Sequence, residues 1–320
     1  GWPPYTQDPG TVFAKAVLRE AENDPRIVGI TAAMPEGTGM DALRDRFPKR
    51  YFDVGLAEEH AVTFAAGLAA EGYRPVVAIY SSFLQRAFDQ IEHDVCLQKL
   101  PVILCIDRAG LVGEDGPTHH GVFDYSYLRM IPGMTVMAPG DENELQHMLR
   151  TAIELNAPVS IRYPRGNGVG VAIDSEPKAL PIGKGIRLKD GTDVTLLAIG
   201  NRVHPALEAA HLLEDRGFSA GVVNMRFVKP LDVELLKECA AKTPRLVTIE
   251  DNVLQGGFGS AILEALTPGR AEVLRLGIPD AFVEHGAPHL LYDSIGLSGP
   301  KIAERVAAWL PQKSRAAVQP

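Results

Sequence analysis

Hydrophobic and polar positions along the first half of the chain alternate between the period of an amphipathic helix and short apolar runs. The apolar runs predict strands over Arg26–Thr31, Val76–Tyr80, Val102–Asp107, Thr135–Met137 and Val159–Arg162. The helix-period segments predict helices over Thr11–Ala21, Ala57–Ala70, Phe83–Gln98 and Asp141–Leu155. Strands that alternate with helices are typical of a parallel sheet that is covered on both faces.

A stretch without periodicity, which contains several Gly and Pro residues, interrupts this alternation and predicts a linker over residues 169–185. After it the pattern predicts strands over Val194–Ile199, Ala220–Val223, Arg245–Glu250 and near Val273. Helices are predicted over Val203–Arg216, Val233–Ala241, from about Ser260, and over Pro300–Leu310. We therefore predict an α/β protein of two domains, residues 1–168 and 186–320, each a mostly parallel sheet covered by helices.

The composition narrows the range of partners. A net charge of −8 argues against a nucleic-acid surface, which needs a basic excess. The three cysteines are odd in number, and their spacing fits neither a disulfide framework nor a metal site, which favours a reducing, cytoplasmic setting. No apolar run reaches the length that crosses a membrane, so we expect no membrane partner.

Polar and aromatic side chains follow several of the predicted strands. Tyr80 and Phe83 lie just after one strand, and Arg108 lies just after another. The carboxylates Glu58 and Glu59 follow a short strand and open a helix. Because ligands of open parallel sheets bind outside the carboxyl ends of the strands, these positions predict a binding site at one edge of the first sheet.

The loop Leu111–Val122 adds to this site. It is rich in Gly, has no hydrophobic period, and contains Glu114, Asp115, His119 and His120. A loop of this length inside a compact domain is usually functional, although a solvated surface loop is the alternative. No metal-ligand spacing accompanies the histidines, so we favour proton transfer or substrate contact over a metal site.

The strings FDVGLAEEHAVTFAAGLA, YSSFLQRAFDQIEHDV, IDRAGLVGEDGPTHHG and YPRGN resemble the pyrimidine-binding domain of the 1-deoxy-D-xylulose-5-phosphate synthase family. The string IEDNVLQGGFGSA is similar to the carboxy-terminal domain of the transketolase superfamily, and together the resemblance covers essentially the whole chain. It implies a homodimeric, thiamine-diphosphate-dependent transferase. The implied reaction joins pyruvate to D-glyceraldehyde 3-phosphate and releases CO2, at the entry to non-mevalonate isoprenoid, thiamine and pyridoxal biosynthesis.

The resemblance also implies roles for single residues. The cofactor's pyrimidine needs a carboxylic acid facing it, and the family match assigns this role to Glu58. The pattern alone leaves Glu58 and Glu59 equal, because either could be a carboxylate at a helix start. Phe83 matches the aromatic residue that stacks on the pyrimidine, with ordinary core packing as the alternative. Asp115 and His119 match a polar pair that orients intermediates and moves protons.

Three arginines match the positions that bind substrate in the family. Arg108 and Arg165, with help from Tyr80, are expected to hold the sugar phosphate, for which arginine has the bidentate geometry. Arg86 is expected near the pyrimidine and the pyruvate-derived group. The alternative for each is a surface ion pair of little energetic consequence, and it is most serious for Arg86, which lies within a helix pattern.

The motif that binds the cofactor's diphosphate through Mg²⁺ in this family, Gly-Asp-Gly followed by Asn, is absent from the sequence. The nearest strings, EDG at 114–116 and KDG at 189–191, lack the expected continuation, so we expect no metal site in this chain. The chain starts at Gly1 rather than Met. We therefore expect that an amino-terminal domain comes from a separate or cleaved polypeptide, and that the chain alone is inactive.

Two other functions are compatible with parts of this pattern. The beta subunit of a 2-oxoacid dehydrogenase shares the two-domain layout and also lacks the metal motif. It would pass its acyl group to a lipoyl arm, however, and would need no phosphate-binding arginines. A non-catalytic assembly or binding module would give no cofactor-dependent signal at all.

The sequence leaves the roles of two smaller features undecided. The glycine-rich turn at residues 255–260 precedes a helix and could bind an anion at the helix amino end, or could serve close helix–strand packing. His93 lies in the helix pattern that starts at Phe83, and could face either the core or the site.

Overall fold

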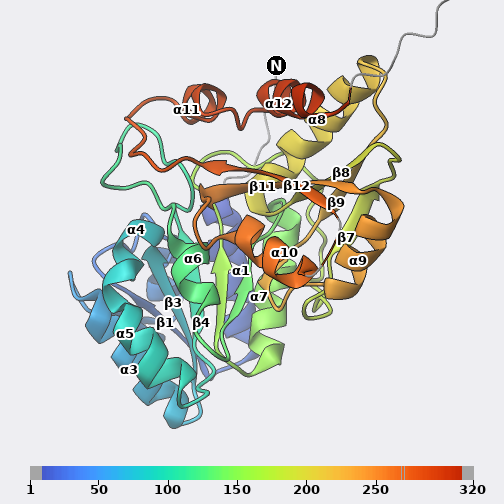
Figure 1. Ribbon diagram of the computed structural model, residues 1–320. Coiled ribbons are helices and arrows are strands. Elements are labelled where there is room, and N and C mark those ends of the chain that lie inside the picture. Colours follow the sequence, from blue (N-terminus) through green and yellow to red (C-terminus); the bar gives the residue numbers. More distant parts are fainter. Residues whose placement is uncertain (1–8, 268, 270, 312–320) are drawn as a thin grey trace, which may run out of the picture.

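The computed structural model describes residues 9–267, 269 and 271–311, and within them the chain forms two sheets flanked by helices (Figure 1). In these residues the first sheet has seven strands in the order β10-β5-β6-β4-β3-β1-β2. Its strands are β1 Ile27–Thr31, β2 Tyr51–Asp53, β3 Arg74–Tyr80, β4 Ile103–Asp107, β5 Thr135–Met137, β6 Val159–Arg162 and β10 Phe227–Lys229. All neighbours pair in parallel except β10, which runs antiparallel to β5.

Helices cover both faces of the first sheet. They are α1 Pro9–Asn23, α2 Asp41–Arg46, η1 Pro48–Arg50, α3 Glu58–Ala70, α4 Ser81–Leu84, η2 Gln85–Ala87, α5 Phe88–Gln90, η3 Ile91–Cys96, α6 Asp124–Arg129 and α7 Glu142–Leu155. In β3, Val76 and Ala78 pack into the core with α1 and α7, whereas Val77 and Ile79 pack into the core with α3. Because both faces are buried, the strand is apolar at every position from Val76 to Ile79.

The second sheet has five strands in the described residues, in the order β12-β11-β8-β9-β7. They are β7 Ile186–Lys189, β8 Val194–Ala198, β9 Ala220–Asn224, β11 Arg245–Val253 and β12 Glu272–Ile278, and only β7 is antiparallel to its neighbour. The helices of this part are η4 Gly200–Arg202, α8 Val203–Asp215, α9 Val233–Lys242, α10 Phe258–Leu266, α11 Pro288–Ser294 and α12 Gly299–Trp309. Residues of α8 and α12 pack into one apolar core. Residues of α9 and α10 pack into a different core, the one that also contains α3.

The predicted α/β architecture with two mostly parallel sheets is confirmed. The prediction of a single helix over Phe83–Gln98 is wrong, because this segment consists of the short turns α4, η2, α5 and the π-helical turn η3. Hydrophobic spacing does not distinguish i→i+4 hydrogen bonds from the i→i+3 and i→i+5 bonds of such turns. Among the described residues, no helix is both long enough and apolar enough to cross a membrane.

Strand β10 joins the two parts of the chain, which the sequence did not predict. It follows β9 of the second sheet, yet it pairs with β5 at the edge of the first sheet, with Phe227 opposite Met137. The apolar core that contains α3, α9 and α10 is also shared by the two parts of the chain, since it includes Leu104 of the first sheet and Leu197 of the second. The second part therefore packs directly against the first.

A buried cluster of charges connects the same two parts. Arg162, the last residue of β6, is 3% exposed, and its Nε donates to both carboxylate oxygens of Asp124 at 2.9 and 2.7 Å. Its Nη1 donates to the Asp251 carboxylate of β11, and its Nη2 donates to the carbonyl oxygen of Gly121 at 3.0 Å. The guanidinium also lies 4.2 Å from the centre of the Tyr125 ring. One side chain thus fixes α6, β11 and the end of the loop that precedes α6.

Glu250, the neighbour of Asp251 in β11, resolves the role of the glycine-rich turn. Its carboxylate accepts hydrogen bonds from the backbone N–H groups of Phe258 at 2.7 Å and Gly259 at 2.8 Å, at the amino end of α10. The group bound at this helix end is therefore the protein's own carboxyl side chain. Burial raises the pKa of Glu250 to about 8, although the two N–H donors oppose the rise.

Replacement of Arg162 should strongly destabilise the fold. Arg162→Met leaves the carboxylates of Asp124 and Asp251 buried without their cation, which costs about 3–5 kcal/mol in comparable buried pairs. We expect a large fall in the urea midpoint and in Tm. Arg44→Met is the control, because Arg44 forms only exposed ion pairs with Glu36 and Asp45 and should change neither value much. Equal midpoints for Arg162→Met and wild type would show that the cluster does not hold the two parts together.

Glu250 should give the stability a pH dependence. An acid whose pKa rises from 4.5 to about 8 on folding stabilises the fold most below pH ~4.5 and loses that contribution as the pH rises toward 8. Glu250→Gln resembles the neutral acid and does not titrate. The Tm of wild type minus that of Glu250→Gln should therefore fall between pH 5 and pH 8. Glu238→Gln, at an exposed position, is the control. If the difference in Tm between wild type and Glu250→Gln changes with pH as little as the difference between wild type and Glu238→Gln, the raised pKa of Glu250 is contradicted.

Candidate active site

Helix α3 begins at Glu58, and the start of this helix separates two neighbouring carboxylates. Glu58 is 1% exposed, whereas Glu59 and His60 are exposed. The Nη1 of Arg86 donates a hydrogen bond to the Glu58 carboxylate at 2.7 Å. The burial supports the choice of Glu58 over Glu59, and the ion pair of Arg86 is made with the site carboxylate rather than with an unrelated surface acid.

Aromatic rings form the next part of the site. Tyr80, at the end of β3, and Phe83, in α4, lie nearly parallel, with ring centres 5.7 Å apart and an interplanar angle of 21°. The rings of His119 and Phe83 form an edge-to-face contact, with their centres 5.3 Å apart and an interplanar angle of 70°. The Arg86 guanidinium lies 5.3 Å from the centre of the Phe83 ring. Phe83 is therefore in contact with two nearby residues of its own segment and with His119 of the loop that follows β4.

Arg108 follows β4 and packs on the Tyr80 ring of this stack. Its guanidinium lies 4.1 Å from the centre of the Tyr80 ring, pairs with Asp107 at 3.0 Å, and donates to the carbonyl oxygen of Gly37 at 2.6 Å. Its φ of +55° is in the left-handed region, which turns the chain sharply after the strand. Burial raises the pKa of the Tyr80 phenol, and the charge of Arg108 opposes this rise.

The sequence interpretation missed Gly37, which makes this packing possible. A Cβ atom at Gly37 would lie 1.8 Å from the Tyr80 hydroxyl and 3.4 Å from Nη2 of Arg108. Any larger residue would displace the Tyr80 side chain. The string PEGTGM around this position carries the only local signal, a cluster of Gly and Pro, and such clusters also mark ordinary turns.

Arg165 and Asp115 form an ion pair at 2.8 Å between a segment that follows β6 and the loop that follows β4. Their side chains are 48% and 46% exposed, so the pair contributes little, roughly 0–1 kcal/mol. Both charges are close enough to affect the Tyr80 phenol. An incoming anion can therefore replace Asp115 on Arg165 at small cost.

All eight residues selected from the sequence lie at the carboxyl edge of the first sheet, after strands β2, β3, β4 and β6. They are Glu58, Tyr80, Phe83, Arg86, Arg108, Asp115, His119 and Arg165. The arrangement combines a buried carboxylate, stacked aromatic rings, a histidine and three cations. Such a set can hold a flat heteroaromatic ring on one side and an anionic substrate on the other, and can move a proton between them.

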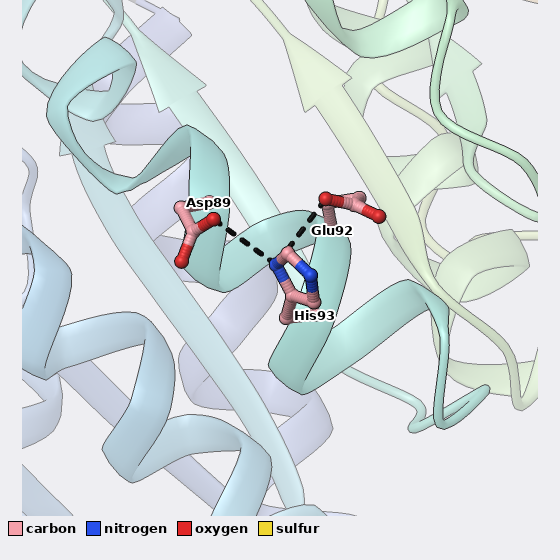
Figure 2. Close-up of side chains that lie close together, drawn as sticks. All are labelled: Asp89, Glu92 and His93. Carbon is pink, nitrogen blue, oxygen red and sulfur yellow. Dashed lines mark hydrogen bonds and ion pairs between the residues drawn. The ribbon is translucent and has the colours of Figure 1, made fainter.

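His93 lies outside this group. It is exposed on the π-helical turn η3, and its Nδ1 lies 3.0 Å from Asp89 and 3.2 Å from Glu92 (Figure 2). These two carboxylates raise the pKa of His93, Glu92 more than Asp89. Among the described residues, these three side chains are the one group whose spacing could suit a metal. Their mutual ion pairs account for that proximity, and the exposure of His93 shows that it does not face the core.

Two protein families match successive parts of the chain. Residues 6–169 match the family described as transketolase, pyrimidine binding domain, and residues 183–302 match transketolase, C-terminal domain. A solved structure described as a split gene transketolase, inactive β4 tetramer, is 33% identical with a TM-score of 0.85. The alignment covers 95% of this chain and 98% of that one. Transketolase from Campylobacter jejuni, 20% identical with a TM-score of 0.80, shares the fold over 96% of this chain and 48% of its own length.

Curated relatives are more similar in sequence but longer. The protein named 1-deoxy-D-xylulose-5-phosphate synthase in Desulforudis audaxviator is 54% identical over 97% of this chain and 49% of its own length. The protein of the same name in Syntrophus aciditrophicus is 60% identical over 88% of this chain and 43% of its own length. The chain thus spans about half the length of these relatives. It belongs to the transketolase family, with that family's pyrimidine-binding and C-terminal domains, and its curated relatives are named 1-deoxy-D-xylulose-5-phosphate synthases.

Proposed function

We propose that this chain provides the pyrimidine-binding half of the active site of a 1-deoxy-D-xylulose-5-phosphate synthase. In this reaction pyruvate loses its carboxylate as CO2, its carbonyl carbon bonds to the aldehyde carbon of D-glyceraldehyde 3-phosphate, and a proton reaches the aldehyde oxygen. The observation that carries the proposal is the buried carboxylate of Glu58, held by Arg86 beside the stacked rings of Tyr80 and Phe83. The names of the relatives support the same activity.

The residues of the site fit thiamine diphosphate. When bound, this cofactor supplies a nucleophilic carbon and accepts the electron pair released by decarboxylation. Glu58 has the position and burial needed to hold a proton toward a pyrimidine nitrogen, because it is removed from water and its neighbour Glu59 is not. Phe83 offers a ring face for stacking. Arg86, which contacts both residues, would orient the carboxylate.

The remaining residues suit a phosphorylated aldehyde and a carboxylate. Arg108 and Arg165 have the bidentate geometry for the acceptor's phosphate, and Tyr80 is packed against Arg108. The Asp115–Arg165 pair would open to admit the phosphate and would free Asp115 to orient the substrate. His119 lies against Phe83, where it would deliver the proton to the aldehyde oxygen of the acceptor.

The rest of the site would come from the amino-terminal half that the relatives carry, which would also hold Mg²⁺ on the cofactor's diphosphate. We call this chain together with that half the complete enzyme. The solved relative described as an inactive β4 tetramer supports the expectation that such a chain assembles but is inactive by itself. We further propose a cytoplasmic homodimer that serves isoprenoid, thiamine and pyridoxal biosynthesis.

The alternative is the beta subunit of a 2-oxoacid dehydrogenase. It would explain the two domains and the lack of a Gly-Asp-Gly motif equally well. It gives no reason for two arginines, Arg108 and Arg165, beside one tyrosine at the site. Because a lipoyl arm carries no phosphate, we favour the synthase.

Removal of the Glu58 acid should abolish activity without unfolding. In the complete enzyme, Glu58→Gln keeps the shape of the side chain but takes away its ability to exchange a proton, and we expect product formation to fall by about 10²–10⁴-fold. Glu59→Gln, one residue away and exposed, is the control and should retain wild-type rates. Rates are measured as 1-deoxy-D-xylulose 5-phosphate formed, with Tm recorded for each variant. A Glu58→Gln enzyme as active as its control would remove Glu58 from this role.

Loss of Arg165 should mainly weaken binding of the phosphorylated acceptor. For Arg165→Met in the complete enzyme we expect the KM for D-glyceraldehyde 3-phosphate to rise at least about tenfold, because a hydrogen bond to a charged group is lost. The KM for pyruvate, and that for unphosphorylated D-glyceraldehyde, should change little. Arg245→Met, which removes an ion pair with Glu272 in the second sheet, is the control. An unchanged KM for the phosphorylated acceptor would mean that other residues bind the phosphate.

A further inference from the structure

The loop at residues 111–121, which we call the site loop, has two sides. One side carries Asp115 and His119, which contact Arg165 and Phe83 in the candidate active site. The other side lies against residues 283–292 of the second part of the chain, which we call the clasp segment. The loop therefore depends on both parts of the chain for its position.

Hydrogen bonds join the backbone of the site loop to the clasp segment. The N–H of Leu111 donates to the hydroxyl of Tyr292 at 3.0 Å, and the N–H of Gly286 donates to the carbonyl oxygen of Gly113 at 3.2 Å. Gly113 has a φ of +95°, and a Cβ atom there would lie 3.0 Å from Pro288. The two segments thus touch without room for a side chain at this point.

His120 contributes both a bond within the site loop and a bond to the clasp segment. It is 4% exposed, and its Nδ1 accepts a hydrogen bond from the N–H of Val112 at 3.1 Å. An Nδ1 that accepts carries no hydrogen, so the neutral ring has its hydrogen on Nε2. That nitrogen lies 3.2 Å from the carbonyl oxygen of Glu284, to which it donates.

We propose that His120 is a positioning residue that ties the site loop to the clasp segment and thereby sets where Asp115 and His119 lie. The neighbouring histidines then divide two tasks, since His119 faces the site and His120 holds the loop. This inference rests on the proposed function, because that function gives Asp115 and His119 their roles. Within the described residues, the positions of both depend on the tie through His120, on the contacts of Leu111 and Gly113, and on the bond of Arg162 to Gly121.

The tie requires a neutral ring. A second hydrogen, on Nδ1, would face the N–H of Val112 and break that bond. Burial lowers the pKa of His120; the carbonyls of Glu284 and Val283 oppose the shift, and neighbouring His119 adds to it. The side chain of Glu284 is exposed, so only its carbonyl enters the contact. The tie is therefore intact at and above neutral pH, and weakens as the pH falls below the usual histidine range near 6.5.

Two substitutions separate the contributions of the ring. His120→Leu removes both hydrogen bonds and keeps an apolar side chain in the buried position. His120→Asn offers an oxygen where Nδ1 lies, so it can still accept from the Val112 N–H, and it does not titrate. Glu284→Gln is the control, because the tie uses only the main-chain carbonyl of that residue.

The first measurement is hydrogen–deuterium exchange of the Leu111–Gly113 backbone in the complete enzyme without substrates, corrected for the intrinsic effect of pH. At pH 7.5 we expect exchange at least tenfold faster in His120→Leu than in wild type, an intermediate rate in His120→Asn, and no change in Glu284→Gln. As the pH falls below 6.5 the wild-type loop should lose protection, whereas His120→Asn should show no such step. Wild-type protection in His120→Leu would overturn the proposal.

The second measurement is steady-state kinetics of the same variants. We expect kcat to fall at least tenfold in His120→Leu, with partial recovery in His120→Asn and a wild-type value in Glu284→Gln. A loosened loop with an unchanged kcat would contradict the positioning role while the proposed function stands. If wild type itself forms no 1-deoxy-D-xylulose 5-phosphate, the proposed function fails, and the exchange data still decide whether His120 holds the loop.

Discussion

The buried guanidinium of Arg162 is the interaction on which the rest of the structure depends. It neutralises Asp124 from one part of the chain and Asp251 from the other, and it also binds the carbonyl oxygen of Gly121. A buried cation is tolerated only when its hydrogen bonds are satisfied, so β6, α6 and β11 must come together for any of the three charges to be stable. Since Gly121 ends the site loop, the same condition that joins the two parts of the chain also fixes one end of that loop.

Neighbouring residues of the same type have opposite environments at two places in the site. Glu58 is buried at the start of α3 while Glu59 is exposed, and His119 faces Phe83 while His120 is buried against the clasp segment. In each pair one side chain lies in the candidate active site, and the other is either exposed to solvent or packed in a structural contact. Helix and loop geometry bring this about, because successive side chains point in different directions from the backbone.

Much of the fold follows from local pattern, since the apolar run of β3 is long enough and dense enough to predict a strand buried on both faces. The site residues follow from family-specific strings, which carry information that periodicity does not. Contacts between distant segments could not be predicted in this way. The pairing of β10 with β5, the ion pair of Arg162 with Asp251, and the fit of Gly37 against Tyr80 each depend on residues far apart in sequence. No local spacing encodes which distant partner a buried polar group will find.

The most direct test of the central claim is a product assay on the complete enzyme, supplied with pyruvate, D-glyceraldehyde 3-phosphate and Mg²⁺, with and without thiamine diphosphate. We expect 1-deoxy-D-xylulose 5-phosphate and CO2 in equal amounts, only when thiamine diphosphate is present. Release of CO2 from pyruvate without formation of 1-deoxy-D-xylulose 5-phosphate would contradict the synthase assignment, and acetyl transfer to an added lipoyl protein would then identify a dehydrogenase subunit.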